Sequence, residues 1–194
     1  MTQQPRRPET TPQHEHINGV DTEELFSKID MIQENPQMAQ THWQAKTIWQ
    51  GGSVSETHVT SWAIGGEEHP QDFTIKIDEP VELLGSGQAP NPQQVLMAAV
   101  NACILGTYVV NAAVRGVRLD SLEIDIEGDI DLRGYLGIDE SITKGYEEIN
   151  YTVRVRGDGT REQFEEIHEA ATSHSPNFYT VTHPVPLNGR LVIE

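Results

Sequence analysis

The sequence predicts an α+β protein in which sheets wrap around helices. One apolar stretch, 92–114, has the length of a long helix, and segments that alternate apolar and polar residues lie on both sides of it. Strands that are grouped, rather than each followed by a helix, are typical of the α+β class. With 194 residues, of which 36% are hydrophobic, the chain is large enough for one domain with its own core.

The chain is strongly acidic. It has 30 acidic and 13 basic residues, which gives a net charge of −17. Such a surface repels phosphate backbones and anionic lipid, so we expect neither nucleic acid nor a membrane as a partner. The acidity favours solubility and would equally suit a high-salt cytoplasm. The N-terminal sequence lacks the apolar run of a signal peptide, and one cysteine cannot form a disulfide within the chain, so we expect a cytoplasmic protein.

The N-terminal residues 1–18 are predicted to be a disordered tail, because they are rich in Pro, Gln, Thr and charge. His14 and His16 in this tail could bind a metal ion weakly. A solvated tail is the simpler interpretation, and no metal site is expected.

A helical extension is predicted over 19–40. Asp21 or Thr22 caps its helix, and Pro36 ends it. Strands are then predicted at 42–50, 54–64 and 73–77.

The long helix has clear start signals. Asn91 is a good N-cap, Pro92 suits the first helical position, and Gln94 completes an arrangement like a capping box. The helix is about long enough to span a bilayer, at ~20 apolar residues. It also carries asparagines, a threonine and a glycine, and it lacks aromatic anchors, so a buried core helix of a soluble protein is favoured.

A long strand is predicted over 119–132, where apolar and polar residues alternate. Its polar face carries five acids: Glu123, Asp125, Glu127, Asp129 and Asp131. They could bind a divalent cation, but neighbours two apart on a strand lie ~7 Å from each other, so a solvated face is favoured. The remaining elements are predicted as a strand at 146–156, a helix at 161–171 and a last strand at 190–193. No P-loop, GxGxxG or GxSxG motif is present, and no cofactor is expected.

Several motifs follow one another along the chain from Asp78 onward. A Pro-initiated helix, an Ala-Cys step, a Gly turn and a long strand ending in Gly-Asp-x-Asp occur in DEPVELLGSGQAPNPQQVLMAAVNACILGTYVVNAAVRGVRLDSLEIDIEGDIDL, and the stretches GYEEINYTVRV and SPNFYTVTHPVPLNGRL come after it. The order of these pieces resembles the OsmC/Ohr family, the osmotically inducible and organic hydroperoxide resistance proteins, in which the last two correspond to the second long strand and the Cys-Pro segment. The resemblance implies an OsmC-like domain over 41–194. It also implies antiparallel sheets wrapped around central helices in an intertwined homodimer, with active sites where the subunits meet.

The resemblance further implies thiol chemistry, with departures. Enzymes of the family reduce organic hydroperoxides with a peroxidatic cysteine, which an arginine and a glutamate activate and a second cysteine resolves. Cys103 matches the peroxidatic position. Ser175 stands in place of the resolving cysteine, Gln93 in place of the glutamate, and Ser53 is nearest to the place of the arginine. Because a hydroxyl cannot close a disulfide, the two-cysteine cycle is expected to be absent.

Two alternatives concern the same residues. A cysteine between Ala102 and Ile104 on an apolar helix is also typical of a small core residue. Ser175 could act as a nucleophile with His174 or His183 as its base, although no nucleophile elbow surrounds it.

Three functions follow, in order of preference. The first is an OsmC-like homodimer that lacks the two-cysteine cycle and whose inherited pocket binds an apolar small molecule. The second is a one-cysteine hydroperoxide reductase, a peroxidase in which an external thiol resolves Cys103. The third is a non-catalytic structural or interaction dimer.

Overall fold

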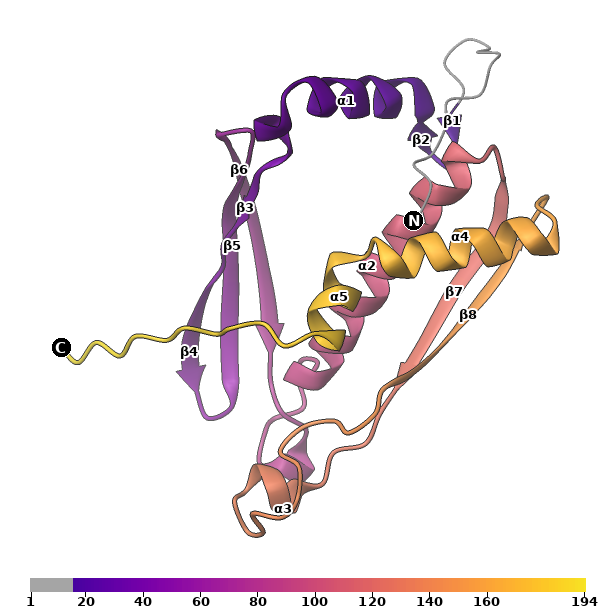
Figure 1. Ribbon diagram of the computed structural model, residues 1–194. Coiled ribbons are helices and arrows are strands. Elements are labelled where there is room, and N and C mark those ends of the chain that lie inside the picture. Colours follow the sequence, from indigo (N-terminus) through magenta and orange to yellow (C-terminus); the bar gives the residue numbers. More distant parts are fainter. Residues whose placement is uncertain (1–15) are drawn as a thin grey trace. The chain divides into compact units, whose positions relative to one another are not determined.

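The structure, a computed structural model, describes residues 16–194 (Figure 1). The described residues divide into two compact units, 16–98 and 99–194, which we call the N-terminal and C-terminal units and describe separately. The longest helix, α2 (Pro92–Val114), crosses this division. Most of the predicted tail, including His14, lies outside the described residues.

The N-terminal unit begins with two short strands and a helix. β1 (His16–Ile17) pairs with β2 (Val20–Asp21), so this pair starts inside the segment predicted to be a tail. α1 (Thr22–Glu34) is capped by Asp21, whose carboxylate accepts a hydrogen bond from the backbone N–H of Glu24 at 2.9 Å. A 3-10 turn, η1 (Pro36–Ala39), follows, so the cap and the stop lie where the sequence predicts them.

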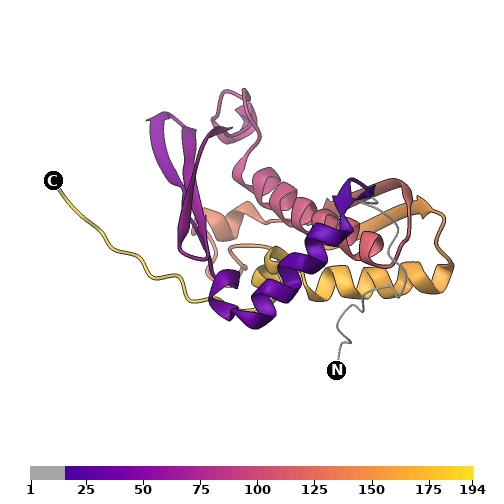
Figure 2. The same cartoon turned by 90° about the horizontal axis from the view of Figure 1, so that it is seen from above.

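One antiparallel sheet forms most of this unit, and its strands lie side by side in one twisted layer (Figure 1, Figure 2). Its members are β3 (Thr41–Trp43), β4 (Lys46–Gly51), β5 (Val54–Ile64) and β6 (Glu67–Ile77). β5 pairs with β3 and β4 along one edge and with β6 along the other. The strand predicted at 42–50 is thus two strands. β6 starts well before 73, because an edge strand tolerates Pro70, which interrupts the sequence pattern.

The C-terminal unit packs helices against a two-stranded sheet. Its elements after α2 are β7 (Leu119–Glu127), α3 (Leu132–Tyr135), β8 (Asn150–Gly157), α4 (Arg161–Ser173) and α5 (Pro176–Thr182). β7 and β8 pair antiparallel over almost their full length (Figure 1). The core lies between α2 and α4. Its buried residues are Tyr108 and Ala112 of α2, Val117 just after α2, and Ile167 and Ala171 of α4. Apolar residues of the sheet, among them Leu122 and Val153, pack against this cluster.

The strand predicted over 119–132 is shorter than expected. It stops at Glu127, and Asp131 instead caps α3 by accepting a hydrogen bond from the N–H of Arg133 at 2.9 Å. The chain leaves the ladder after Glu127 and continues as the loop 128–149, which returns to β8. This path brings the ring of Tyr146 so close to Gly128 that a Cβ there would lie 2.8 Å from it.

Two differences occur near the C-terminus. The short helix α5 was not predicted, and the strand predicted at 190–193 is absent, because 183–194 has no regular structure here. A strand needs a neighbouring edge for its backbone hydrogen bonds, and this segment pairs with none within the described residues. Its large apolar side chains are exposed; Leu187 is 99% and Leu191 84% exposed.

The acidic face of β7 has cationic neighbours on β8. Arg154 forms ion pairs with Glu123 and Asp125, and Arg156 lies 3.9 Å from Asp120. The register places Arg154 directly opposite Glu123. In the part of the chain that the structure describes, no three His, Cys, Asp or Glu residues are arranged to hold a metal ion. Cross-strand pairing with arginine therefore accounts for part of the acidic pattern.

α2 leaves much of its apolar surface uncovered. By length and composition alone the helix could cross a membrane, and 22% of its most apolar window is buried within the chain. Ile104 and Tyr108 are buried, whereas Leu96, Leu105 and Val110 are exposed. Part of the apolar surface of this helix is therefore left open within the described chain.

Candidate functional site

Cys103 lies in the middle of α2 and is partly exposed. Its thiol forms no hydrogen bond with any described residue, while its backbone carbonyl accepts one from the Thr107 hydroxyl at 2.8 Å. The side chain is therefore neither sealed in the core nor engaged by a neighbour.

Ser175 is buried, with 1% of its surface exposed, and it caps α5. Its hydroxyl accepts a hydrogen bond from the N–H of Phe178 at 3.4 Å, and its carbonyl accepts one from the N–H of Tyr179 at 3.0 Å. This is the standard use of serine at a helix start. Nothing in these contacts activates the hydroxyl as a nucleophile.

α5 is attached to the turn of α2 that leads to Cys103. The side-chain amide of Asn177 donates a hydrogen bond to the carbonyl of Ala99 at 2.8 Å. In an α-helix that carbonyl also accepts the N–H of the residue four positions later, which is Cys103. The start of α5, with Ser175, is thus held beside the helical turn that carries the cysteine. Sequence spacing gave no sign of this contact, which joins residues 78 positions apart.

A cavity of about 290 Å³ lies between α2, β7, β8 and α5, and we call it the α5 cavity. Its lining is largely apolar and aromatic: Val100, Ile126, Tyr146, Ile149, Tyr151, Phe178 and Val181, with Glu147, Glu148 and Thr182. The rings of Tyr151 and Phe178 meet edge to face with centroids 6.0 Å apart. Burial raises the pKa of the Tyr151 hydroxyl. Val100, one helical turn before Cys103, lines the cavity, whereas Cys103 itself does not.

A second hollow of about 670 Å³, which we call the acidic cleft, adjoins the α5 cavity and shares Glu147 and Glu148 with it. It is lined by the end of β7, the loop 128–149 and the start of β8: Glu127, Gly128, Asp129, Asp131, Ile142, Thr143, Gly145, Glu147, Glu148 and Asn150. No lysine or arginine lines it, within the described residues. Ligands with negative charge are disfavoured there.

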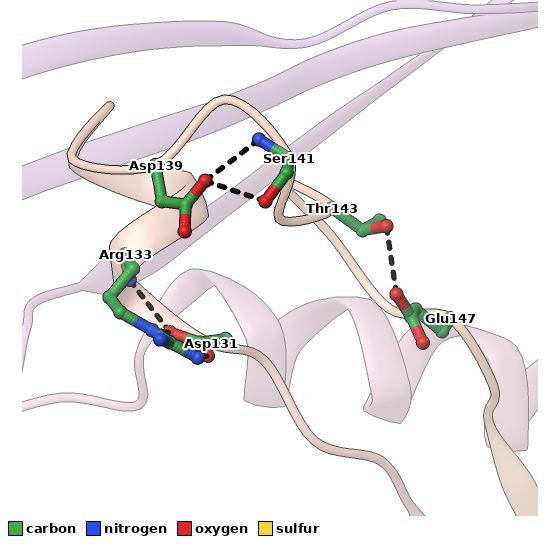
Figure 3. A network of polar contacts seen from close by, with 6 residues as sticks. All are labelled: Asp131, Arg133, Asp139, Ser141, Thr143 and Glu147. Carbon is green, nitrogen blue, oxygen red and sulfur yellow. Dashed lines mark hydrogen bonds and ion pairs between the residues drawn. The ribbon is translucent and has the colours of Figure 1, made fainter.

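Polar contacts hold the loop 128–149 in shape (Figure 3). The guanidinium of Arg133 bonds the Asp131 carboxylate, with Nε 3.0 Å from Oδ2, and lowers the pKa of Asp131 to about 2. Ser141 donates its hydroxyl and its N–H to Asp139, which lowers the pKa of that carboxyl. The Thr143 hydroxyl donates to Glu147 at 2.9 Å. These bonds hold the carboxylates of Asp131, Asp139 and Glu147 in place.

Ser53 and Gln93, the other two predicted site residues, belong to the N-terminal unit. The hydroxyl of Ser53 donates to the carboxylate of Asp78 at 2.6 Å, and Asp78 is only 1% exposed. Gln93 is exposed in the first turn of α2, whereas Gln94 and Asn91 form the reciprocal capping box that the sequence predicts. Ser53 therefore supports the fold, whereas the side chain of Gln93 forms no hydrogen bond or ion pair with a described residue.

Asp78 was not singled out from the sequence, yet it organises the loop before α2. Besides Ser53, it accepts hydrogen bonds from the Ser86 hydroxyl at 2.6 Å and from the backbone N–H groups of Glu79, Ser86 and Gln88. These bonds, that of Ser53 first, hold the pKa of the Asp78 carboxyl well below its usual range. These hydrogen bonds have a structural role, because they hold the loop before α2 around the buried Asp78 carboxylate.

The sequence model of the OsmC-like protein family matches residues 85–189, which is more than half of the chain. The chain belongs to the OsmC-like protein family. The match includes Gln93, Cys103 and Ser175 but begins after Ser53. No curated protein matches the sequence.

Solved OsmC-like structures share this fold. An OsmC-like protein from Mycoplasma pneumoniae has a TM-score of 0.57 and 15% identity, over 72% of this chain and 86% of its own. A protein from Psychrobacter arcticus, named for osmotic stress induction and detoxification, has a TM-score of 0.55 and 14% identity, over 72% and 88%. An OsmC-like protein from Vibrio cholerae has a TM-score of 0.52 and 14% identity, over 72% and 92%. At such identities the likeness shows the fold alone, an α+β arrangement with antiparallel sheets, as predicted.

In this OsmC-like chain the four predicted site residues fall into two pairs. Cys103 and Ser175 both belong to the C-terminal unit, where Asn177 holds the start of α5 against the turn of α2. Ser53 and Gln93 belong to the N-terminal unit. Ser53 and Ser175 have structural roles as a hydrogen-bond donor and a helix cap, whereas the side chains of Cys103 and Gln93 form no hydrogen bond with a described residue.

Proposed function

We propose that this OsmC-like protein binds an apolar small molecule in the α5 cavity and does not run a two-cysteine peroxidase cycle. The observation that carries the proposal is the position of the cavity, which adjoins the turn of α2 before Cys103 and is lined mainly by apolar side chains. The chain has one cysteine, and the hydroxyl at Ser175 is buried and caps α5. An oxidised Cys103 therefore has no resolving thiol within its own chain.

We also propose that the protein is a homodimer. The support is uncovered apolar surface, on α2 and on one face of the N-terminal sheet, where Trp49 is 73% and Phe73 62% exposed. A second copy could cover both, and the family resemblance leads to the same expectation. Sedimentation velocity at micromolar concentration tests this; a species of 21.6 kDa alone would contradict it.

Binding is tested with Nile red, a neutral apolar dye whose fluorescence rises when it leaves water. Saturable binding is expected for the wild type. Phe178→Ala removes an aromatic wall of the cavity and should weaken binding by about tenfold or more. Tyr179→Ala is the matched control, because Tyr179 is the next residue of α5, is 56% exposed and does not line the cavity. Equal affinities of the two variants, or no saturation, would overturn the proposal.

The second candidate is a one-cysteine hydroperoxide reductase, which the partial exposure of Cys103 favours. In that reaction the thiolate attacks the distal peroxide oxygen, the O–O bond breaks, and the alcohol leaves with a proton while the cysteine becomes a sulfenic acid. An external thiol then condenses with the sulfenic acid to form a mixed disulfide and water, and a second external thiol reduces that disulfide, which restores the cysteine and leaves the two external thiols joined as a disulfide. Oxidation of Cys103 by an organic hydroperoxide, followed by turnover with thiols, separates this reaction from simple binding.

A further inference from the structure

The α5 cavity combines an apolar interior with an acidic rim. Val100, Ile126, Phe178 and Val181 supply apolar walls. Glu147 and Glu148 line both this cavity and the acidic cleft, so they stand where the two spaces adjoin. A molecule that fills the apolar space and extends toward the cleft would place its end beside these carboxylates.

Nothing in the described structure neutralises the two rim glutamates. Neither Glu147 nor Glu148 forms an ion pair with a described residue, and the cations of the nearby loop are paired elsewhere. Arg133 is bonded to Asp131, and the Lys144 ammonium lies 3.3 Å from Glu140. The Thr143 hydroxyl donates to Glu147, which fixes that carboxylate without cancelling its charge (Figure 3). The rim therefore presents negative charge at a defined place.

We propose that the α5 cavity selects amphiphiles with a cationic head group, such as an alkyl chain that ends in an ammonium. This rests on the proposed function, since it names the ligand class for the same cavity. The apolar part of such a ligand gains from burial against Phe178 and its neighbours. The ammonium is attracted by Glu147 and Glu148, whereas the carboxylate of a fatty acid is repelled by them.

The test compares three ligands with the same ten-carbon chain: decyltrimethylammonium, 1-decanol and decanoate. Each displaces Nile red from the wild-type protein below its micelle concentration, at pH 7 and constant low ionic strength. We expect decyltrimethylammonium to bind most tightly and decanoate least. The difference should be about fivefold for each interacting charge, and it should shrink as salt is added.

Charge removal tests whether the rim is responsible. In the double variant Glu147→Gln and Glu148→Gln, the preference for the cation should fall to within about twofold of 1-decanol. The double variant Glu166→Gln and Glu169→Gln is the matched control, because it changes the net charge equally on exposed residues of α4 outside both hollows. It should keep the wild-type preference.

The outcomes separate the two proposals. If none of the three ligands displaces the dye, the proposed function fails. If all three bind with equal affinity, or if both double variants change the preference alike, binding stands but the cationic selectivity is wrong. Tight binding of decanoate that is lost in Phe178→Ala would likewise keep the cavity and overturn the selectivity.

Discussion

The acidic groups of the two units are held in opposite ways. In the N-terminal unit, Asp78 is buried and accepts hydrogen bonds from two serine hydroxyls and three backbone N–H groups. In the C-terminal unit, Glu147 and Glu148 are exposed at the border of two hollows, and neither has an ion-pair partner among the described residues. A carboxylate whose lone pairs are all satisfied serves the fold, whereas one that faces an open space remains available to a ligand.

The largest effect is expected when the buried carboxylate is removed. Asp78→Ala leaves two hydroxyls and three amides without their acceptor, and unsatisfied buried donors are costly. We expect the melting temperature to fall by roughly 10 °C. The matched control is Asp72→Ala, an exposed acid on β6, which should change it by less than about 2 °C. If both variants melt alike, Asp78 does not organise the loop.

The pH dependence of stability sharpens the same contrast. The pKa of Asp78 is lowered in the folded protein, so its ionised form stabilises the fold. That contribution is fully present above the unfolded pKa of about 3.9 and is lost as the pH falls toward the lower, folded pKa. Urea unfolding between pH 5 and pH 3 should therefore show a steeper loss of stability in the wild type than in Asp78→Asn. Parallel curves would count against this linkage.

Much of the fold could be predicted because local signals agree with the final contacts. Asn91 and Gln94 form a capping box visible in four consecutive letters, and alternation marks β5 and β7. The N-terminal half of β6 could not be predicted, because Pro70 and nearby polar residues hide it, and its register comes from pairing with β5. Here tertiary pairing overrides the local pattern.

The candidate site shows the same limit. Cys103 could be found from its family position, and Ser175 from the residue before a proline. The contact that brings their segments together could not be predicted, because the hydrogen bond from Asn177 to Ala99 joins distant parts of the chain and no local pattern encodes it. Asp78 was missed for the same reason, since its first partner, Ser53, lies 25 residues away. The rim at Glu147 and Glu148 depends on the path of the loop 128–149.

Cys103, like Glu147 and Glu148, belongs to the C-terminal unit, and its thiol is not engaged by a described side chain. Its oxidation tests whether the thiol is reactive. Cumene hydroperoxide should convert Cys103 slowly to a sulfenic or over-oxidised acid, detected by mass spectrometry of the intact protein, with no disulfide-linked dimer on a non-reducing gel. The residue in the place of the activating arginine is neutral, so turnover with dithiols should be weak. Cys103→Ser is the control. Fast, saturable turnover that this variant abolishes would favour the one-cysteine peroxidase.

The smallest effect on stability is expected from the exposed glutamates. Glu147→Gln and Glu148→Gln together remove two charges from a cleft that already contains Glu127, Asp129 and Asp131, and they break no ion pair among the described residues. Relief of repulsion should offset the weaker hydrogen bond from Thr143, so the melting temperature should change by no more than about 2 °C, upward if at all.

Salt dependence identifies the cause of that small change. Repulsion between exposed charges is screened over about 3 Å at 1 M ionic strength, so any gain over the wild type should vanish in 1 M NaCl. The variant Glu166→Gln and Glu169→Gln, which removes the same charge from α4, shows how much of the gain reflects net charge alone. A fall of several degrees in the Glu147 and Glu148 variant would mean that these carboxylates support the fold as Asp78 does. In that case the contrast between the two units, and with it the argument that the rim is free to select a ligand, would be wrong.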